Sequence, residues 1–228
     1  EHHKVARAYV LYREQRAASR YHTKKLKEQV GVKVSSMMVT KRDGTKEPVS
    51  LDKITNRVSV LSTGLSIDPI VVAQKAIPGL YNDITSTEID NYLAETSAAL
   101  TVEHPDYSNL AARIKSNALH KLTPGFVIAT KNLFEDGLLL ESYYNKVMKN
   151  AEEIESIIDY DRDYSFDYFA LTTLIRAYLL KFENKTIERP QDLWMRVALT
   201  VSCNTFNIDK LKQTYNSLSS GLYTHATP

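Results

Sequence analysis

The densest group of residues that could carry chemistry lies between Lys41 and Lys53. Lys41 and Arg42 are adjacent cations beside a tight turn at Asp43-Gly44, and Lys53 follows in the first turn of a predicted helix. A helix start presents free backbone N–H groups and the positive end of the helix dipole. Cations that converge on such a helix start can hold a triphosphate through charge-assisted hydrogen bonds. The alternative is a solvated charged hairpin, because Lys and Arg are usually exposed.

Several familiar catalytic and nucleotide-binding patterns are missing from the sequence. It contains no G-x-x-x-x-G-K-[ST], no G-x-G-x-x-G and no H-E-x-x-H, so a P-loop ATPase, a kinase and a Rossmann dehydrogenase are unsupported. Cys203 is the single cysteine, which excludes an internal disulfide and a multi-cysteine zinc site. We expect Cys203 to be buried and inert. No catalytic or metal-ligating residue is predicted in this chain.

Two polar features are expected to have structural roles. His120 is predicted to end a helix, where a cation interacts favourably with the helix dipole. The segment Tyr160-Asp161-Arg162-Asp163 could be mistaken for an acid–base site, but such a cluster more often caps a helix and pairs its own charges. We therefore assign chemistry to neither.

Composition and charge are those of an ordinary globular protein. Hydrophobic residues make up 43% and charged residues 25%, and the formal net charge is +2. So small a charge does not by itself indicate nucleic-acid or membrane binding, and no apolar run approaches the roughly 20 residues that span a bilayer. We expect neither partner, and a reducing, cytoplasmic location. The chain begins with Glu1 rather than Met, which suggests that it is truncated or trimmed.

A hairpin and four helices are predicted to position the cations. Strands at 37–40 and 47–49 flank the Asp43-Gly44 turn, and Pro48 predicts that the second strand lies at a sheet edge or is short. Pro78 should kink or shorten the second helix. The predicted helix starts are Ser50, Asp68-Pro69, Thr85 with Glu88, and Pro105. The predicted apolar faces include Ile54, Val58 and Leu61, then Ile89, Leu93, Thr96 and Leu100, then Tyr107, Leu110, Ala111, Ile114 and Leu119.

The remaining chain is predicted to be helical as well. One helix covers 4–29, another begins near Val127, and a polar segment at 159–163 breaks the helices. Residues 166–180 are aromatic-rich and mostly apolar, and a last helix covers 209–222. Arg189-Pro190 opens a further helix, whose predicted buried face is Leu193, Trp194, Val197 and Val201.

Several motifs in one colinear order resemble a known family. The segments 39–44, 47, 51–54, 79–81, 85–90, 94–96, 104–107, 110–114 and 119–121 resemble an ATP-cone, a small nucleotide-sensing domain. Further on, Tyr160 to Phe166, Glu188-Arg189-Pro190-Gln191 and Thr224 to Pro228 resemble the class I ribonucleotide reductase large subunit. The segment 5–16 resembles the last helix of a different ATP-cone, which suggests that an earlier cone was lost upstream.

The resemblance implies a mainly α fold. Residues 31–130 would be the ATP-cone, a short β-hairpin plus a four-helix cap, and 131–228 would be the helical region leading into the reductase ten-stranded α/β barrel; residues 1–30 would be the helix that ends a preceding cone. The cone would bind ATP or dATP, with Mg²⁺ accompanying the nucleotide. The implied nucleotide contacts are Lys41, Arg42, Glu47, Pro48, Val49, Ser50, Leu51, Asp52, Lys53, Ser86, Asp90 and Lys121, and the implied substrate contacts are Ala226 and Thr227.

The resemblance also implies partners. The full enzyme would reduce a nucleoside diphosphate, using a radical supplied by a small metal-containing subunit, and its large subunits would form homo-oligomers. This chain has one cysteine, outside any matching motif, so it lacks the cysteines of the reaction. The alternatives are a freestanding ATP-cone regulator, which usually carries a zinc ribbon that one cysteine cannot form, and a purely structural helical protein.

Overall fold

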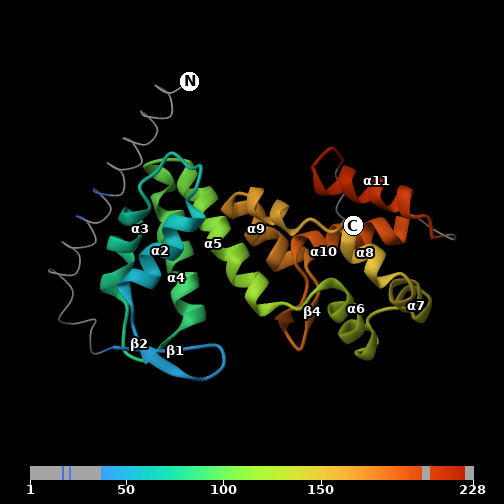
Figure 1. The fold of residues 1–228 in the computed structure, drawn as a ribbon, viewed down its shortest axis with the longest axis horizontal. Coiled ribbons are helices and arrows are strands. Elements are labelled where there is room, and N and C mark those ends of the chain that lie inside the picture. The colour runs from blue at the N-terminus through green and yellow to red at the C-terminus, as the bar shows by residue number, and fades with distance from the viewer. Residues whose placement is uncertain (1–16, 18–20, 22–36, 202–205, 224–228) are drawn as a thin grey trace. The chain divides into compact units, whose positions relative to one another are not determined.

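The computed structural model describes residues 17, 21, 37–201 and 206–223 (Figure 1). The chain divides into two compact units, Glu1–Ile114 and Lys115–Pro228. Three predictions lie outside the described residues: the helix over 4–29 apart from residues 17 and 21, the burial of Cys203, and the substrate contacts Ala226 and Thr227. Within the described part, no helix combines the length and apolar character needed to cross a membrane.

The first unit contains a small sheet. Strands β1 (Met38–Thr40) and β2 (Lys46–Pro48) are antiparallel, and β2 lies at the edge, as Pro48 predicted. Gly44 adopts φ +83° in the connecting loop, a conformation that favours glycine, and its N–H donates to the Lys41 carbonyl at 3.0 Å. A third strand, β3 (Ile84–Thr85), pairs in parallel with β1 and was not predicted. This pairing joins the start of a later helix to the hairpin.

Local capping signals correctly predicted the helices of this unit. Helix α2 (Leu51–Leu61) begins after Ser50, whose side chain accepts from the Lys53 backbone N–H. Helix α3 (Pro69–Ala76) is capped by Asp68, and the 3₁₀ turn Ile77–Gly79 follows where Pro78 was expected to shorten it. Helix α4 (Ser86–Ala99) begins with the Thr85–Glu88 capping box and is followed by the 3₁₀ turn Leu100–Val102. Helix α5 (Asp106–Leu122) begins directly after Pro105.

The predicted apolar faces form the core of the first unit. Val58, Leu93, Leu110 and Ile114 are each 1% exposed or less. Helices α2 and α3 pack together, and α3 packs on α4. Burial of these side chains fixes α2 and α4 beside the sheet, so their first turns face the hairpin (Figure 1).

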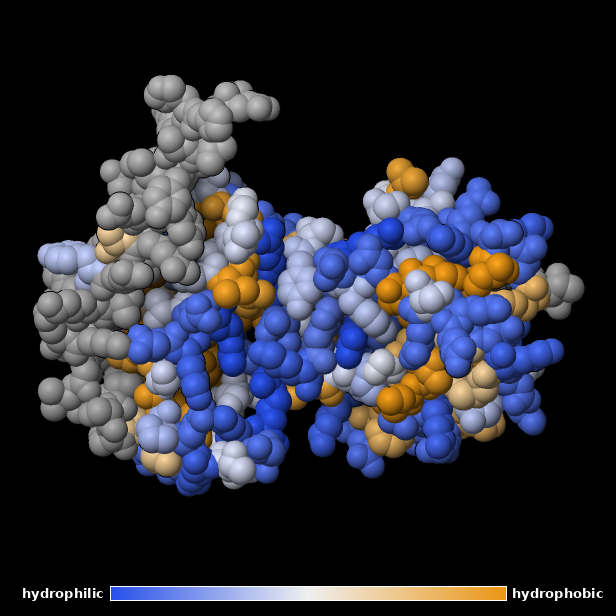
Figure 2. Space-filling model, viewed as in Figure 1, coloured by the Kyte–Doolittle hydropathy of each residue, from blue (hydrophilic) through white to orange (hydrophobic). Residues whose placement is uncertain are grey.

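The second unit is built from short helices. They are α6 (Phe126–Glu135), α7 (Glu141–Lys149), α8 (Ala151–Ile157), the 3₁₀ helix Tyr160–Ser165, α9 (Tyr168–Thr173), the π-helical turn Leu174–Tyr178, α10 (Pro190–Val201) and α11 (Ile208–Ser219). A hairpin of β4 (Lys181–Phe182) and β5 (Lys185–Thr186) was not predicted. In Figure 2, hydrophilic side chains make up much of the surface that is not drawn in grey.

The predicted buried face of α10 is partly wrong. Leu193 is buried, but Val201 is 63% exposed, and Trp194 and Val197 are only partly buried. The residues that are buried instead, Met195, Ala198 and Leu199, pack in a cluster with Leu211 and Tyr215 of α11. A helical period identifies one apolar face, whereas α10 packs against neighbours on two sides.

The polar segment at 159–163 differs from its prediction. Asp159 does cap the 3₁₀ helix, and its carboxylate pairs with Arg162 at 3.1 Å. Asp163, however, is fully buried and lies 2.7 Å from Nε2 of His120, so these two side chains form a hydrogen bond inside the second unit. His120 therefore has a side-chain partner as well as its place in the last turn of α5.

Candidate functional site

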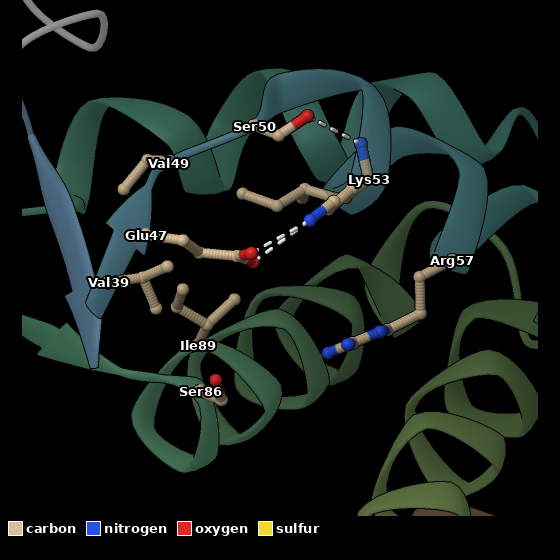
Figure 3. Close-up of a pocket in the computed structure, with 9 residues that line it drawn as sticks. Val39, Glu47, Val49, Ser50, Lys53, Arg57, Ser86 and Ile89 are labelled. Atoms are coloured by element: carbon tan, nitrogen blue, oxygen red, sulfur yellow. Dashed lines mark hydrogen bonds and ion pairs between the residues drawn. The ribbon is translucent and has the colours of Figure 1, made fainter. Parts of the chain in front are cut away.

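Two adjoining hollows lie between the hairpin and the first turns of α2 and α4, and Figure 3 shows the residues that line the smaller one. The larger hollow has a volume of about 390 Å³, within the range of small-molecule sites. We call it the charged hollow, and it is lined by Lys41, Arg42, Asp43, Glu47, Lys53, Arg57 and Ser86. The second, which we call the apolar hollow, is lined by Val39, Glu47, Val49, Ser50, Lys53, Ile54, Arg57, Ser86 and Ile89.

Glu47 bridges the two lysines of the charged hollow. Its carboxylate lies 2.7 Å from Nζ of Lys41 and 3.0 Å from Nζ of Lys53. Hydrogen bonds from Lys41 and then Lys53 lower the pKa of Glu47, and the hydrogen bond to Glu47 raises the pKa of Lys41. All three side chains are at least 28% exposed, so the pairs are screened by water and add little to stability. Their exposure leaves them free to exchange partners.

Asp90 holds two arginines at the base of the site. Its carboxylate is 2% exposed; Oδ2 accepts from Nη2 of Arg42 at 2.6 Å, and Oδ1 accepts from Nη1 of Arg57. A buried carboxylate is costly unless it is paired, and each of its oxygens here has a guanidinium partner. The pairs therefore fix both arginines before any ligand arrives.

Two helix N-termini complete the walls. Ser50 caps α2 through the Lys53 N–H at 3.3 Å, and Ser86, the first residue of α4, donates from Oγ to the Thr40 carbonyl at 3.4 Å. Each N-terminus presents backbone N–H groups and a partial positive charge. Together with the cations, they make the site suited to a polyanion.

The structure brings together most of the predicted contacts. Lys41, Arg42, Glu47, Lys53 and Ser86 line the charged hollow, and Val49 and Ser50 join the apolar one.

The other predicted contacts line neither hollow. Asp90 lies behind the arginines as their counter-ion. Pro48, Leu51 and Asp52 stand beside lining residues in the chain, and Lys121 is an exposed residue of the second unit.

Sequence reasoning missed Arg57 and part of the apolar wall. Arg57 lies four residues after Lys53 and so occupies the same face of α2 one turn later, a spacing that could have revealed it. Ile89 follows Ser86 by three residues on α4, but its helical face was assigned only to the core.

Metal ions in proteins are commonly held by groups of His, Cys, Asp or Glu side chains. The described ranges, 37–201 and 206–223 with residues 17 and 21, hold no group of three or more His, Cys, Asp or Glu side chains placed to bind a metal ion. Carboxylates in the charged hollow are already engaged, Asp43 with Thr45 and Glu47 with the lysines.

The comparisons identify the domain that carries the two hollows as similar to an ATP-cone. The family model described as "ATP cone domain" matches residues 37–122, which include both hollows. A second model, described as "Ribonucleotide reductase, all-alpha domain", matches residues 164–228. The two matches occur in the order that the sequence motifs predicted.

Similar proteins define the family. The chain is 43% identical to the ribonucleoside-diphosphate reductase large subunit of Arabidopsis thaliana over 84% of this chain and 25% of that protein. It is 43% identical to the ribonucleoside-diphosphate reductase large subunit of Dictyostelium discoideum over 86% of this chain and 24% of that protein. It is also 43% identical to the ribonucleoside-diphosphate reductase large chain 2 of Saccharomyces cerevisiae, over 84% of this chain and 23% of that protein. The chain belongs to the family of ribonucleoside-diphosphate reductase large subunits, and it spans about a quarter of their length.

Proposed function

We propose that the first unit binds ATP or dATP as a regulatory effector of a ribonucleoside-diphosphate reductase. The observation that carries this proposal is the convergence of Lys41, Arg42, Lys53 and Arg57 on one hollow of about 390 Å³. Asp43 and Glu47 line the same hollow, and Asp90 pairs with the arginines, so four cations face three carboxylates. The excess positive charge and the two helix N-termini favour an anion, and Mg²⁺ bound to a triphosphate would offset more of its negative charge.

The apolar hollow suits the base of the nucleotide. Val39, Val49, Ile54 and Ile89 supply aliphatic surface against which a flat ring can pack. Its volume is only about 60 Å³, below the range of ligand pockets. In Figure 3 the Glu47–Lys53 pair lies across this hollow, so we expect the pair to separate when a base enters.

Separation of the Glu47–Lys53 pair would leave both side chains available to the nucleotide. The ammonium group of Lys53 becomes available to a phosphate, and the carboxylate of Glu47 becomes available to a hydroxyl or amino donor of the nucleoside. Because both side chains line both hollows, neither has to leave the site to do this. Lys121 remains a predicted nucleotide contact.

Titration calorimetry on the whole 228-residue chain tests the proposal. We expect ATP and dATP to bind with micromolar dissociation constants, and Lys41→Ala to weaken both by roughly tenfold or more, because it removes a charge-assisted phosphate contact. Lys75→Ala is the matched control, since Lys75 pairs with Glu103 and lines neither hollow. If folded protein gave no heat with either nucleotide and no nucleotide-dependent rise in melting temperature, a purely structural role would be the better account.

We propose the remaining properties of the whole protein from the family. The enzyme would reduce nucleoside diphosphates in the cytoplasm with a radical from a small partner subunit, as a homo-oligomer of large subunits, and Mg²⁺ would accompany the effector. Residues 31–130 would form the regulatory domain, with 1–30 the end of a preceding cone and 131–228 leading into the catalytic barrel, where Ala226 and Thr227 would contact substrate. The match of residues 164–228 to the reductase favours this over a freestanding ATP-cone regulator. A gel-shift assay with DNA would separate the two, and only the regulator should give a shift.

A further inference from the structure

Arg57 stands where the two hollows meet. It is one of four residues that line both, with Glu47, Lys53 and Ser86. Lys41, Arg42 and Asp43 line only the charged hollow, whereas Val39, Val49, Ser50, Ile54 and Ile89 line only the apolar one. Figure 3 shows the Arg57 side chain extending from α2 toward the site. Any ligand that fills both hollows must pass this guanidinium group.

The guanidinium of Arg57 is fixed in place with donors to spare. Its Nη1 donates to Oδ1 of Asp90, which is its one hydrogen-bond acceptor among the described residues. An arginine carries five N–H donors, so this pair leaves most of them for a ligand. The side chain is 33% exposed, against 65% for Lys53. Arg57 is thus the more buried and more rigid of the two cations at the junction.

The order of groups along a nucleotide decides what Arg57 would meet. If the base occupies the apolar hollow and the terminal phosphates lie near Lys41 and Arg42, the junction holds the phosphate attached to the ribose. We propose that Arg57, held by Asp90, binds the α-phosphate of the effector nucleotide. This inference rests on the proposed nucleotide-binding function. It places the Arg57 contact between the part of the site that would bind the nucleoside and the part that would bind the outer phosphates.

The competing explanation is that Arg57 only neutralises Asp90. That role would act through folding or through the position of Arg42, which also pairs with Asp90 and lines only the charged hollow. Its loss would then weaken the binding of ATP more than that of AMP and would not weaken AMP relative to adenosine. A contact with the α-phosphate has a different signature, because adenosine lacks this phosphate while AMP, ADP and ATP share it. The ratio of adenosine to AMP dissociation constants therefore measures the contact, and the ratio of AMP to ATP dissociation constants measures the outer phosphates.

Both ratios can be measured by calorimetry, or by NMR titration for the weaker ligands, on the whole chain. We expect Arg57→Gln to lower the adenosine-to-AMP ratio by roughly tenfold or more and to leave the AMP-to-ATP ratio unchanged within about twofold. Lys41→Ala should lower the AMP-to-ATP ratio and leave the adenosine-to-AMP ratio unchanged, because Lys41 lines only the charged hollow. Lys75→Gln removes the same charge on α3, away from the lining residues, and should change neither ratio.

Melting curves without ligand establish that each variant is folded. If Arg57→Gln does not fold, Arg57→Lys keeps a charge beside Asp90 but loses the guanidinium fork, and the adenosine-to-AMP ratio should then fall several-fold. The inference is overturned if AMP binds the parent chain no more tightly than adenosine, or if the folded Arg57 variant keeps the parent ratio. In both cases ATP would still bind the parent chain, whereas a parent chain that binds neither ATP nor dATP contradicts the proposed function itself.

Discussion

Replacing Asp192 by Asn should remove a large part of the pH dependence of folding in the second unit. Asp192 is fully buried in the first turn of α10. Its Oδ1 accepts from the Tyr160 hydroxyl at 2.7 Å, and its Oδ2 accepts from the Arg189 backbone N–H at 2.8 Å. Burial raises the pKa of Asp192 from its ordinary value to about 7, because desolvation of the charged form outweighs these hydrogen bonds.

The direction of the effect follows from the pKa difference between the two states. In the unfolded chain the Asp192 carboxyl has its ordinary pKa of 3.8, so the folded state binds more protons than the unfolded state between about pH 4 and pH 7. The free energy of unfolding must therefore fall as pH rises through this window. From pH 5 to pH 8 the two pKa values correspond to a loss of roughly 2–3 kcal/mol, as an order of magnitude.

Urea unfolding at pH 5, 6, 7 and 8 measures this loss. The chain has a single tryptophan, Trp194, two residues from Asp192 and packed against the core of the second unit, so its fluorescence reports on that unit. The parent chain should lose stability between pH 5 and pH 8 relative to Asp192→Asn, whose amide cannot ionise. At pH 8 the variant should be nearly as stable as the parent or more stable, because the parent must then bury a charge.

Asp209→Asn is the control for loss of a carboxylate, since Asp209 is exposed on α11. Its stability should follow the parent at every pH. Parallel curves for the parent and Asp192→Asn from pH 5 to pH 8 would refute the reasoning, because they would mean that Asp192 is already ionised in the folded state at pH 5. A change of m value in the variant alone would instead show that the substitution altered the folded or unfolded ensemble.

Two further substitutions test the packing of each unit. Gly79→Ala should lower the free energy of unfolding by about 1–3 kcal/mol, because a Cβ there would lie 2.2 Å from the Tyr92 hydroxyl oxygen. In a Tyr92→Leu background this loss should be smaller, and a double-mutant cycle measured by urea unfolding would show it. In α10, Leu199→Ala should cost about 2–5 kcal/mol and Val201→Ala less than about 0.5 kcal/mol, since Leu199 is 1% and Val201 63% exposed; equal losses in thermal melts would contradict the observed face of the helix.

Features that depend on neighbouring residues were predictable from the sequence. Ser50, Asp68 and the Thr85–Glu88 pair satisfy backbone groups within three residues of themselves, so their capping roles can be read without knowing the fold. The same holds for the hairpin that carries Lys41, because its turn is local. Family resemblance then joined these elements into a domain.

Features that depend on distant pairing were not predictable. Strand β3 has two residues and no alternating pattern, and it exists because it pairs with β1. Asp90 was predicted to contact the nucleotide, but its role as counter-ion to Arg42 and Arg57 requires α2, α4 and the hairpin to be in place. The burial of Asp163 against His120 likewise depends on two segments 43 residues apart. A charged side chain is expected to be exposed, and the burial of Asp90 and Asp163 can be seen only in the tertiary structure.

The short parallel pairing between β1 and β3 is needed to complete the proposed nucleotide site. It sets Val39 opposite Ile84 and brings Ser86 to the carbonyl of Thr40, 46 residues earlier in the chain. A slip of one residue would turn Val39 to the opposite side of the sheet and remove part of the wall of the apolar hollow. A half-assembled chain with only its hairpin and α2 would display positive charge but offer no enclosed place for a base. We therefore expect the affinity of the chain for a nucleotide to report correct pairing of β1 with β3, which the charge of the chain would not report.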